Sequence, residues 1–180
     1  MQDILFIMGQ PNVGKTTLIN RLLQIEKFTL PIHYTNRPPR KDDNGFYTYV
    51  NKSFFTEENM FLWSSDSYDR YYGVQNFDLF TGNSEKIFIV NCSIKNISQV
   101  IQLKKLYKDH IRICILLSQN PISKIENSNT KYDAEEIKYR IQETENELIL
   151  LNKYISQVED FIFYCENYMD LEKIIKNLAG

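Results

Sequence analysis

Apolar residues along the chain gather in short unbroken runs that alternate with segments of helical spacing. The runs lie at about residues 3–8, 86–92, 111–117 and 161–165. A strand covered on both faces has this pattern, because neither of its sides meets water. The segments between the runs repeat apolar residues every three or four positions, as amphipathic helices do. The alternation predicts an α/β fold, with a parallel β-sheet and helices on both of its faces.

Capping residues mark where these helices begin. The first helix is expected over 15–26, and another begins after Ser93. A long helix begins at Asp133, which is followed by acidic residues in a capping-box-like order. Its inner face is predicted to carry these apolar residues: Ile137, Ile141, Leu148, Leu151 and Ile155. A last helix is expected over 169–178, capped by Asn167 or Asp170.

Residues 34–82 break the alternation. They are rich in Tyr and Phe, and their short apolar stretches predict strands at 46–50, 61–65 and 70–75. We interpret this region as a small inserted mixed-β subdomain for a substrate. Weak alternation predicts one more strand, over 28–34. Two short helices are also expected, over 53–60 and 76–82; Ser53 can cap the first, and Gly82 ends the second.

The chain is expected to form a single domain of 180 residues. Its polar, irregular stretch 120–133 is interpreted as a lid. The core then comprises three remaining stretches: 1–33, 83–119 and 134–180. Ligands of such sheets bind at the carboxyl ends of the parallel strands.

A phosphate-binding loop follows the first apolar run. Residues 9–17, GQPNVGKTT, fit the pattern G-x-x-x-x-G-K-[ST]. A strand before this pattern and a helix after it are the context that a P-loop requires. Successive backbone N–H groups and a helix N-terminus then form a concave anion site. The loop is expected to bind the phosphates of a nucleoside triphosphate through the following residues: Gly9, Asn12, Val13, Gly14, Lys15, Thr16 and Thr17.

Two of these residues have specific expected roles. Lys15 would reach the β- and γ-phosphates and act in catalysis, and the hydroxyl of Thr16 would help to hold Mg²⁺. The sequence therefore predicts a P-loop NTPase fold.

Composition narrows the class of protein. The net charge of −2 provides no basic field for nucleic acid. Cys92, Cys114 and Cys165 have no metal-like spacing and lie in or beside apolar runs, so buried free thiols in a reducing cytosol are expected. The opening apolar run is too short for a signal peptide, and no run approaches a membrane span of about 18 residues. A cytoplasmic protein without a membrane partner is expected.

A GTPase is one reading of the loop. Residues 9–20, GQPNVGKTTLIN, resemble the first motif of translation-factor-type GTPases. The D-x-x-G match at 42–45 follows a proline-rich loop and not a strand. Neither 51–54 nor 152–155 completes the guanine-reading N-K-x-D pattern. This reading is therefore the weakest of those that stay open.

The chain resembles the guanylate kinases along nearly its whole length. Residues 34–40, YTNRPPR, are similar to the T-T-R-P-P-R loop of that family. Residues 44–50, NGFYTYV, are similar to N/D-G-x-D-Y-x-F-V with one residue fewer. Residues 61–63 and 71–73, FLW and YYG, are similar to F-x-E-W…Y-Y-G with one residue more. The resemblance implies a kinase that uses ATP and Mg²⁺.

The residues that hold the acceptor's phosphate in that family are retained. The resemblance assigns this role to two arginines and two tyrosines: Arg37, Arg40, Tyr47 and Tyr72. Arginine forks bind phosphate bidentately, and tyrosine hydroxyls add neutral donors. Arg140 matches an arginine that reaches the transferring phosphoryl group, although it could equally be a helix charge paired with Glu136 or Glu143. The family's lid arginines are absent from 124–129, where Lys124 or Lys131 would have to assist.

The family's guanine-reading residues are replaced. The matching positions hold His33, Leu62, Val74 and Asn91, none of which carries a carboxylate. Guanine's N1–H and 2-amino donors would be left unpaired, which costs about 1–3 kcal/mol each. Asn91 and Ser93 also replace acids near the metal, so Mg²⁺ would rest on Thr16, phosphates and water.

The sequence thus favours transfer of the γ-phosphoryl group of MgATP to the phosphate of a small phosphomonoester that is not guanine-like. Such an acceptor, a nucleoside monophosphate or a sugar phosphate, is already anionic, so no general base is required. Three alternatives remain beside the GTPase. They are a guanylate kinase that reads its base differently, an enzyme like the ribose bisphosphate kinases, which share Y-Y-G-V with 71–74, and a degenerate nucleotide-binding or interaction module.

Overall fold

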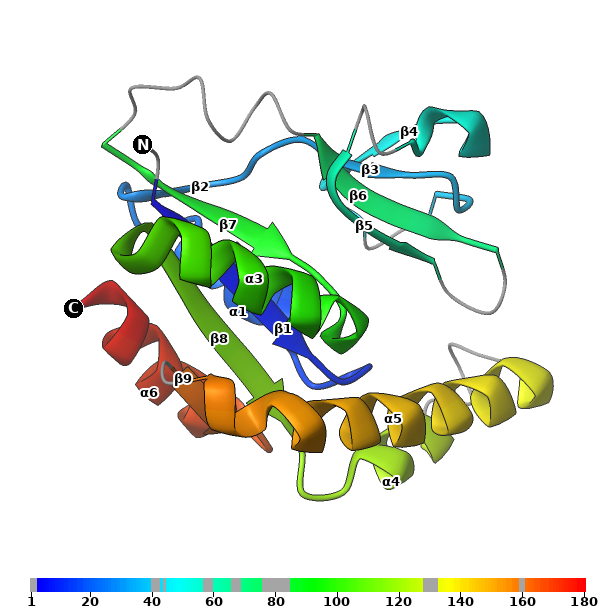
Figure 1. The fold of residues 1–180 in the computed structure, drawn as a ribbon. Coiled ribbons are helices and arrows are strands. Elements are labelled where there is room, and N and C mark those ends of the chain that lie inside the picture. The colour runs from blue at the N-terminus through cyan, green and yellow to red at the C-terminus, as the bar shows by residue number, and fades with distance from the viewer. Residues whose placement is uncertain are drawn as a thin grey trace.

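The main sheet has five strands, all parallel, in the order β2-β7-β1-β8-β9 (Figure 1). The structure is a computed structural model that describes residues 3–39, 43, 45–56, 60–65, 69–75, 85–127, 133–158 and 161–180. The strands of this sheet are β1 Ile4–Gly9, β2 Phe28–Thr29, β7 Ile87–Asn91, β8 Ile111–Leu117 and β9 Phe161–Tyr164. The predicted parallel α/β sheet is therefore confirmed.

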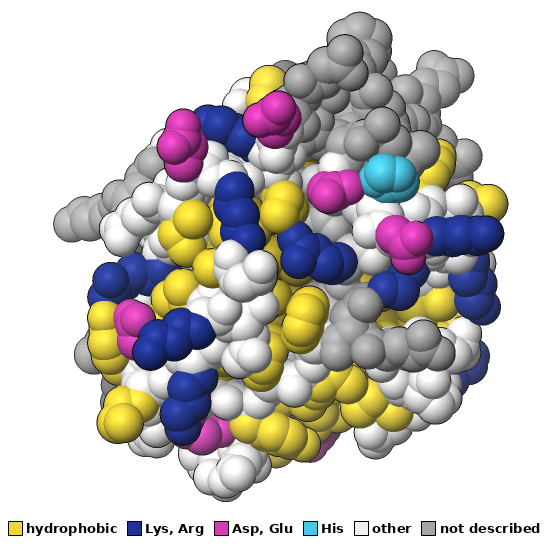
Figure 2. Space-filling model, turned by 90° about the vertical axis from the view of Figure 1, so that its left-hand side faces the viewer, with side chains coloured by type: hydrophobic (Ala, Val, Ile, Leu, Met, Phe, Trp, Pro, Cys, Tyr) yellow, Lys and Arg dark blue, Asp and Glu magenta, His cyan; other side chains and the backbone are white. Residues whose placement is uncertain are grey.

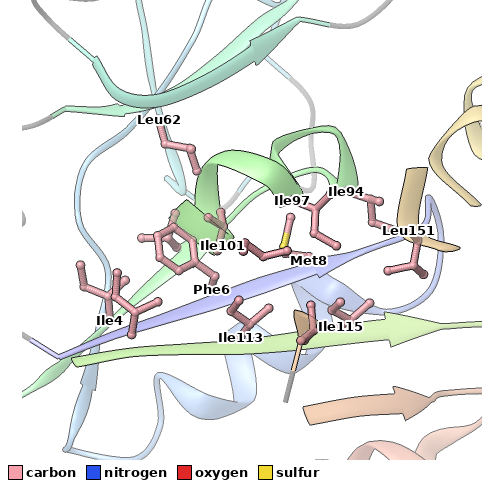
Figure 3. Close-up of a cluster of buried hydrophobic side chains, with 14 of the residues drawn as sticks. Ile4, Phe6, Met8, Leu62, Ile94, Ile97, Ile101, Ile113, Ile115 and Leu151 are labelled. Atoms are coloured by element: carbon pink, nitrogen blue, oxygen red, sulfur yellow. The ribbon is translucent and has the colours of Figure 1, made fainter. Parts of the chain in front are cut away.

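Helices cover both faces of this sheet. Successive residues of β1 point to opposite faces, so each face contributes apolar side chains to its own cluster. Leu5 and Ile7 pack with α1 (Lys15–Leu22) and α6 (Tyr168–Ala179). Phe6 and Met8 pack on the other face, with α3 (Ile97–Tyr107) and α5 (Ala134–Tyr154). Figure 3 shows this second cluster between β1, β8 and α3. The remaining helical segments are short: η1 Lys52–Phe54, η2 Ile94–Asn96, η3 Lys108–His110, α4 Pro121–Glu126 and η4 Ile155–Gln157.

A second, smaller sheet has the order β4-β3-β6-β5 and is mixed. Its strands are β3 His33–Thr35, β4 Tyr47–Tyr49, β5 Met60–Ser65 and β6 Tyr71–Gln75. β3 pairs parallel with β4 and antiparallel with β6, and β6 pairs antiparallel with β5. Leu62 of β5 and Val74 of β6 belong to the same apolar cluster as Phe6 (Figure 3). The small sheet is thus packed onto the core of the main sheet.

Several local predictions were wrong. The single strand expected over 28–34 is divided between the two sheets as β2 and β3, with Pro31 between them, which has no N–H for a sheet ladder. Of the helix expected over 53–60, the described residues form only the turn η1, and Met60 already belongs to β5. The irregular stretch at 120–133 contains α4, which begins at Pro121, where the missing N–H costs nothing. The helix expected over 76–82 lies outside the described residues.

The inner face of α5 also differs from the prediction. Thr144, Glu147 and Leu151 are its buried residues. The predicted isoleucines and Leu148 are only partly buried. Counting apolar positions could not find this face, because two of its three buried residues are polar. The predicted cap is confirmed, since the Asp133 side chain accepts a hydrogen bond from the Glu136 N–H at 2.8 Å.

The described surface matches the modest net charge. Figure 2 shows Lys and Arg side chains spread among acidic, hydrophobic and uncharged ones on the face that it presents. None of the helices in the described ranges combines the length and apolar character that a membrane crossing demands.

Candidate active site

The loop between β1 and α1 has the shape of an anion site. Asn12 and Gly14 have positive φ values of 58° and 100°. Gly14 is the N-cap of α1, and its carbonyl accepts the N–H of Leu18 at 2.9 Å. A left-handed turn followed by a helix N-terminus directs backbone N–H groups toward one point. The predicted loop residues therefore surround a place suited to phosphate groups.

Lys15 lies folded over this loop. Its Nζ donates to the carbonyl oxygens of Gly9 at 2.6 Å and Gln10 at 2.7 Å. Burial lowers the pKa of Lys15 to about 8, and the negative charge of Glu147 opposes this shift. A phosphate anion in the loop would offer the ammonium group a better partner than two neutral carbonyls.

The loop also fits a hard cation beside the phosphates. Thr16 lies in the first turn of α1, next to Lys15. Among the described residues, three buried side-chain oxygen atoms have no hydrogen-bond partner: Oδ1 of Asn91, Oγ1 of Thr144 and Oε2 of Glu147. Oxygen atoms are the ligands that Mg²⁺ prefers. Within the described ranges no group of three His, Cys, Asp or Glu side chains could hold a metal ion, so most ligands would come from phosphates and water.

Arg37 lies close to two tyrosines that were predicted to share its role. The guanidinium of Arg37 is buried and paired with Asp43, to which Nη1 donates at 2.9 Å and Nη2 also donates. It lies 5.0 Å from the ring centroid of Tyr47. The rings of Tyr47 and Tyr72 are 6.2 Å apart. Three of the four predicted phosphate-binding residues are thus neighbours, while Arg40 lies outside the described residues.

The carboxylate of Asp43 is the anion that Arg37 holds in the structure. It also accepts a hydrogen bond from the hydroxyl of Tyr49. Burial raises the pKa of Tyr47 to about 12, so its hydroxyl keeps its proton. A carboxylate is planar and anionic and accepts two parallel bonds from an arginine, as a phosphate does. An acceptor phosphate would have to share Arg37 with Asp43 or take its place.

The four base-reading positions of the resemblance come together in one row. His33 pairs in register with Tyr47 on one side and with Val74 on the other, and Val74 pairs with Leu62. Residues that are paired across strands point to the same face of the sheet. Asn91, at the end of β7, donates its backbone N–H to Nε2 of His33 at 3.1 Å. Its Nδ2 donates to the hydroxyl of Tyr47 at 3.3 Å.

Three of these four residues are buried. Leu62 and Val74 are 4% and 2% exposed within the core cluster, and His33 is 3% exposed. The row contains no carboxylate, and both ring nitrogens of His33 are bonded, since Nδ1 lies 3.0 Å from the carbonyl oxygen of Pro31. Sequence alone could not place these four positions side by side.

His33 gives the fold a pH dependence. Its Nε2 accepts from Asn91, so Nδ1 carries the proton, and protonation of Nε2 would break the Asn91 bond. Burial lowers the pKa of His33 from 6.5 to about 4. Above pH 6.5 the neutral ring contributes its full stability, and this is lost as the pH falls toward 4, at about 1.4 kcal/mol per pH unit. We expect the free energy of unfolding in urea to fall by about 3 kcal/mol over this interval.

The histidine variants separate this effect from general acid unfolding. His33→Gln should be less stable at neutral pH but should show a shallower slope between pH 6.5 and 4. His110→Gln removes an exposed histidine whose Nδ1 lies 2.8 Å from Oδ1 of Asp3, and this variant should keep the slope. Equal slopes in wild type and His33→Gln would contradict the role of His33.

Arg140 and the lid lysine have partners of their own. Arg140 donates to Glu136 at 2.7 Å from Nη2, and Arg70 donates to the same carboxylate at 3.3 Å. Arg140 also interacts electrostatically with Lys15, which places it on the P-loop side of α5. Lys124 donates to the carbonyl of Cys165 at 2.8 Å and pairs with Glu166, and Lys131 lies outside the described residues.

Sequence reasoning missed one residue of this site, Glu147. It lies on α5, is 5% exposed and accepts a hydrogen bond from the Ser93 hydroxyl at 2.5 Å. Burial raises its pKa, and the Ser93 bond and the charge of Lys15 act in the opposite direction. The sequence offered no separate signal, because Glu147 follows Glu143 and Glu145 closely and looks the same as a solvent-exposed helix charge.

Together the parallel sheet, the P-loop at its carboxyl edge and an arginine site on a second sheet define a P-loop kinase. A model of the family described as guanylate kinase matches residues 1–179. The chain belongs to the guanylate kinase family. No curated protein sequence matches it.

Two solved structures resemble the fold. Guanylate kinase from Anaplasma phagocytophilum has a TM-score of 0.67 at 12% sequence identity, and the match covers 99% of this chain and 82% of that one. A gluconokinase from Sinorhizobium meliloti 1021 has a TM-score of 0.44 at 12% identity, with 99% and 96% covered. At such identities the first of these supports the fold alone.

Proposed function

We propose that this kinase transfers the γ-phosphoryl group of MgATP to the phosphate of a small phosphomonoester that is not guanine-like. The observation that carries this proposal is the row at the base-reading positions, where His33, Leu62 and Val74 are buried without a carboxylate. The neighbouring arginine and tyrosine site for a phosphate is nevertheless retained. A site that keeps its phosphate donors and lacks partners for guanine favours another acceptor.

The donor half of the site would work by positioning and charge. The P-loop N–H groups and Lys15 hold the β- and γ-phosphates and stabilise the charge that develops on the equatorial oxygens. Mg²⁺, with Thr16 as its protein ligand, would neutralise the phosphates and fix their geometry. Lys15 need only move from two carbonyl oxygens to the phosphates, so its own loop already places it.

The acceptor half would orient the second phosphate. Arg37 would grip it bidentately after exchange with Asp43, and Tyr47 and Tyr72 would add hydroxyl donors. An oxygen of the acceptor phosphate then attacks the γ-phosphorus, and the bond to the β-phosphate oxygen breaks, which releases ADP. The attacking oxygen is already anionic, so no residue has to remove a proton. Arg140 would stabilise the γ-phosphoryl group during its transfer.

A panel of acceptors tests the proposal. Purified protein is incubated with MgATP and nucleoside monophosphates, ribose phosphates and other sugar phosphates, and ADP release is measured. Two unpaired guanine donors cost about 2–6 kcal/mol, so GMP should be used about 30-fold or more less efficiently than the best acceptor. Turnover with GMP alone would show a guanylate kinase with different base reading. ATP binding without any turnover would favour a nucleotide-binding module, and GTP hydrolysis in preference to ATP would favour a GTPase.

Arg37 supplies a matched variant for this assay. Arg37→Gln should raise the KM of the acceptor about 10-fold or more and leave the affinity for ATP unchanged, because a charge-assisted bond to a phosphate is lost. Arg21→Gln, on the exposed side of α1 where Arg21 pairs with Glu172, is the control and should change neither value. Equal KM values for both variants would contradict the assignment of Arg37.

A further inference from the structure

Glu147 has a carboxylate oxygen with no partner in a buried place. One oxygen, Oε1, accepts from the Ser93 hydroxyl at 2.5 Å, whereas Oε2 is buried and unbonded. Burial of a carboxylate oxygen without a partner is costly. An unpartnered buried atom of this kind in a native fold calls for an explanation, such as a bound ligand that interacts with it.

The position of this oxygen points to the donor site. Burial lowers the pKa of Lys15, but the negative charge of Glu147 raises it, and Glu143 has a smaller effect of the same sign as Glu147, so this part of α5 faces the P-loop lysine. Ser93, its hydrogen-bond donor, is two residues beyond the end of β7. β7 runs parallel to β1, with Asn91 in register with Ile7 just before the loop. Oδ1 of Asn91, at the end of β7, is also buried without a partner, as is Oγ1 of Thr144 on α5.

The residues at the end of β7 include no carboxylate that could bind a metal ion. Its residues after Val90 are Asn91, Cys92 and Ser93. Mg²⁺ in nucleotide sites is held by one or two carboxylates together with phosphates and water. Glu147 is the carboxylate that α5 inserts at this place, and the Ser93 hydroxyl orients it.

We propose that Glu147 supplies the carboxylate for the Mg²⁺ of the bound nucleotide, as an acceptor for the ion or for one of its water molecules. The inference rests on the proposed use of MgATP. Thr16 would serve from the first turn of α1 and Glu147 from α5, with Ser93 as the positioning residue of Glu147. An ion at this point would give Oε2 its missing partner. Its positive charge would also offset the negative charges of Glu147 and of the phosphates.

A purely structural Glu147 predicts a different behaviour. In that case its loss would weaken the packing of α5 on η2 and lower ATP affinity equally with and without metal. A carboxylate that serves the metal repels metal-free ATP and helps only when Mg²⁺ is present. The two roles therefore differ in the sign of the effect in EDTA.

The test measures ATP binding by titration calorimetry in EDTA and in excess MgCl₂, together with free Mn²⁺ by electron paramagnetic resonance in the presence of ATP. In Glu147→Gln, which keeps the shape of the side chain, we expect ATP in EDTA to bind as tightly as in wild type or more tightly. The concentration of Mg²⁺ or Mn²⁺ needed for half-saturation should rise about 10- to 100-fold. Glu145→Gln, an exposed glutamate of α5, is the matched control and should change this concentration less than about twofold.

The outcomes separate the two proposals. Wild type without any effect of metal on ATP binding would overturn the proposed MgATP use and this inference with it. A wild type that responds to Mg²⁺ and a Glu147→Gln variant that responds equally would overturn only the role of Glu147. If Glu147→Gln does not fold, Ser93→Ala decides, because loss of the orienting hydroxyl should raise the metal requirement without weakening ATP binding in EDTA. An unchanged requirement in that variant would refute the inference.

Discussion

Replacement of Lys15 by alanine should lower kcat for phosphoryl transfer by about 10²–10³-fold, the usual loss when a charged donor to the transition state is removed. The ammonium group lies over the loop and donates to the carbonyls of Gly9 and Gln10. It is already desolvated, which lowers its pKa to about 8. A bound triphosphate would favour the charged form, since it brings negative charge within hydrogen-bond reach. The variant therefore loses the cation that the loop had placed for the γ-phosphate.

The measurement pairs single-turnover kinetics with ATP binding. Lys15→Ala removes a donor from the carbonyls of Gly9 and Gln10, which are both buried, so circular dichroism and urea unfolding must show that the variant is folded before its rate is compared. Lys153→Ala, which removes an exposed lysine of α5, should retain wild-type rate and affinity. If Lys15→Ala bound and used ATP as the wild type does, the P-loop would not be the donor site.

Gly9→Ala should destabilise the fold by about 2–5 kcal/mol, the sum of overpacking and backbone strain. Gly9 ends β1 with φ +154°, and a Cβ there would lie 2.4 Å from the carbonyl oxygen of Leu116 in β8. That neighbour is backbone in the middle of the sheet, paired with Gly9 in register, and it cannot swing aside. β1 would have to shift at the start of the P-loop, so the affinity for ATP should fall as well.

Gly45→Ala is the comparison for Gly9→Ala. Gly45 also has positive φ, +74°, but a Cβ there would have nothing within 4 Å. Only the left-handed backbone then resists the methyl group, at about 1 kcal/mol. Urea unfolding of both variants against wild type measures the difference. Equal stabilities for the two variants would contradict the steric argument at Gly9.

The acceptor site shows how far the sequence alone could go. The resemblance named Arg37, Tyr47 and Tyr72, and the structure brings these side chains together. The pairing of Arg37 with Asp43 was not predicted, because Asp43 stood in a motif match for a different class of protein. Whether a charged loop residue faces solvent or its neighbour depends on the course of the loop, which composition does not determine.

The base-reading row was predicted only as a set of substitutions. His33 and Asn91, 58 positions apart, are joined by a hydrogen bond that sets the tautomer of the ring. Leu62 enters the apolar cluster of the main sheet. Their shared face follows from strand register between β3, β6 and β5, and no local pattern encodes that register.

The sequence by itself determined the parallel sheet, the P-loop and its helix, because each depends on neighbours within a few residues: an apolar run, glycines at fixed spacing and a helical period. Only the tertiary structure decided which polar groups are buried together. Ser93 and Glu147 are 54 positions apart and meet because α5 packs against η2. Their contact is a product of long-range packing, in which a buried glutamate and an exposed one have the same local sequence signature. The P-loop thus indicates where the triphosphate is expected to bind, and the fold adds the carboxylate from the far helix.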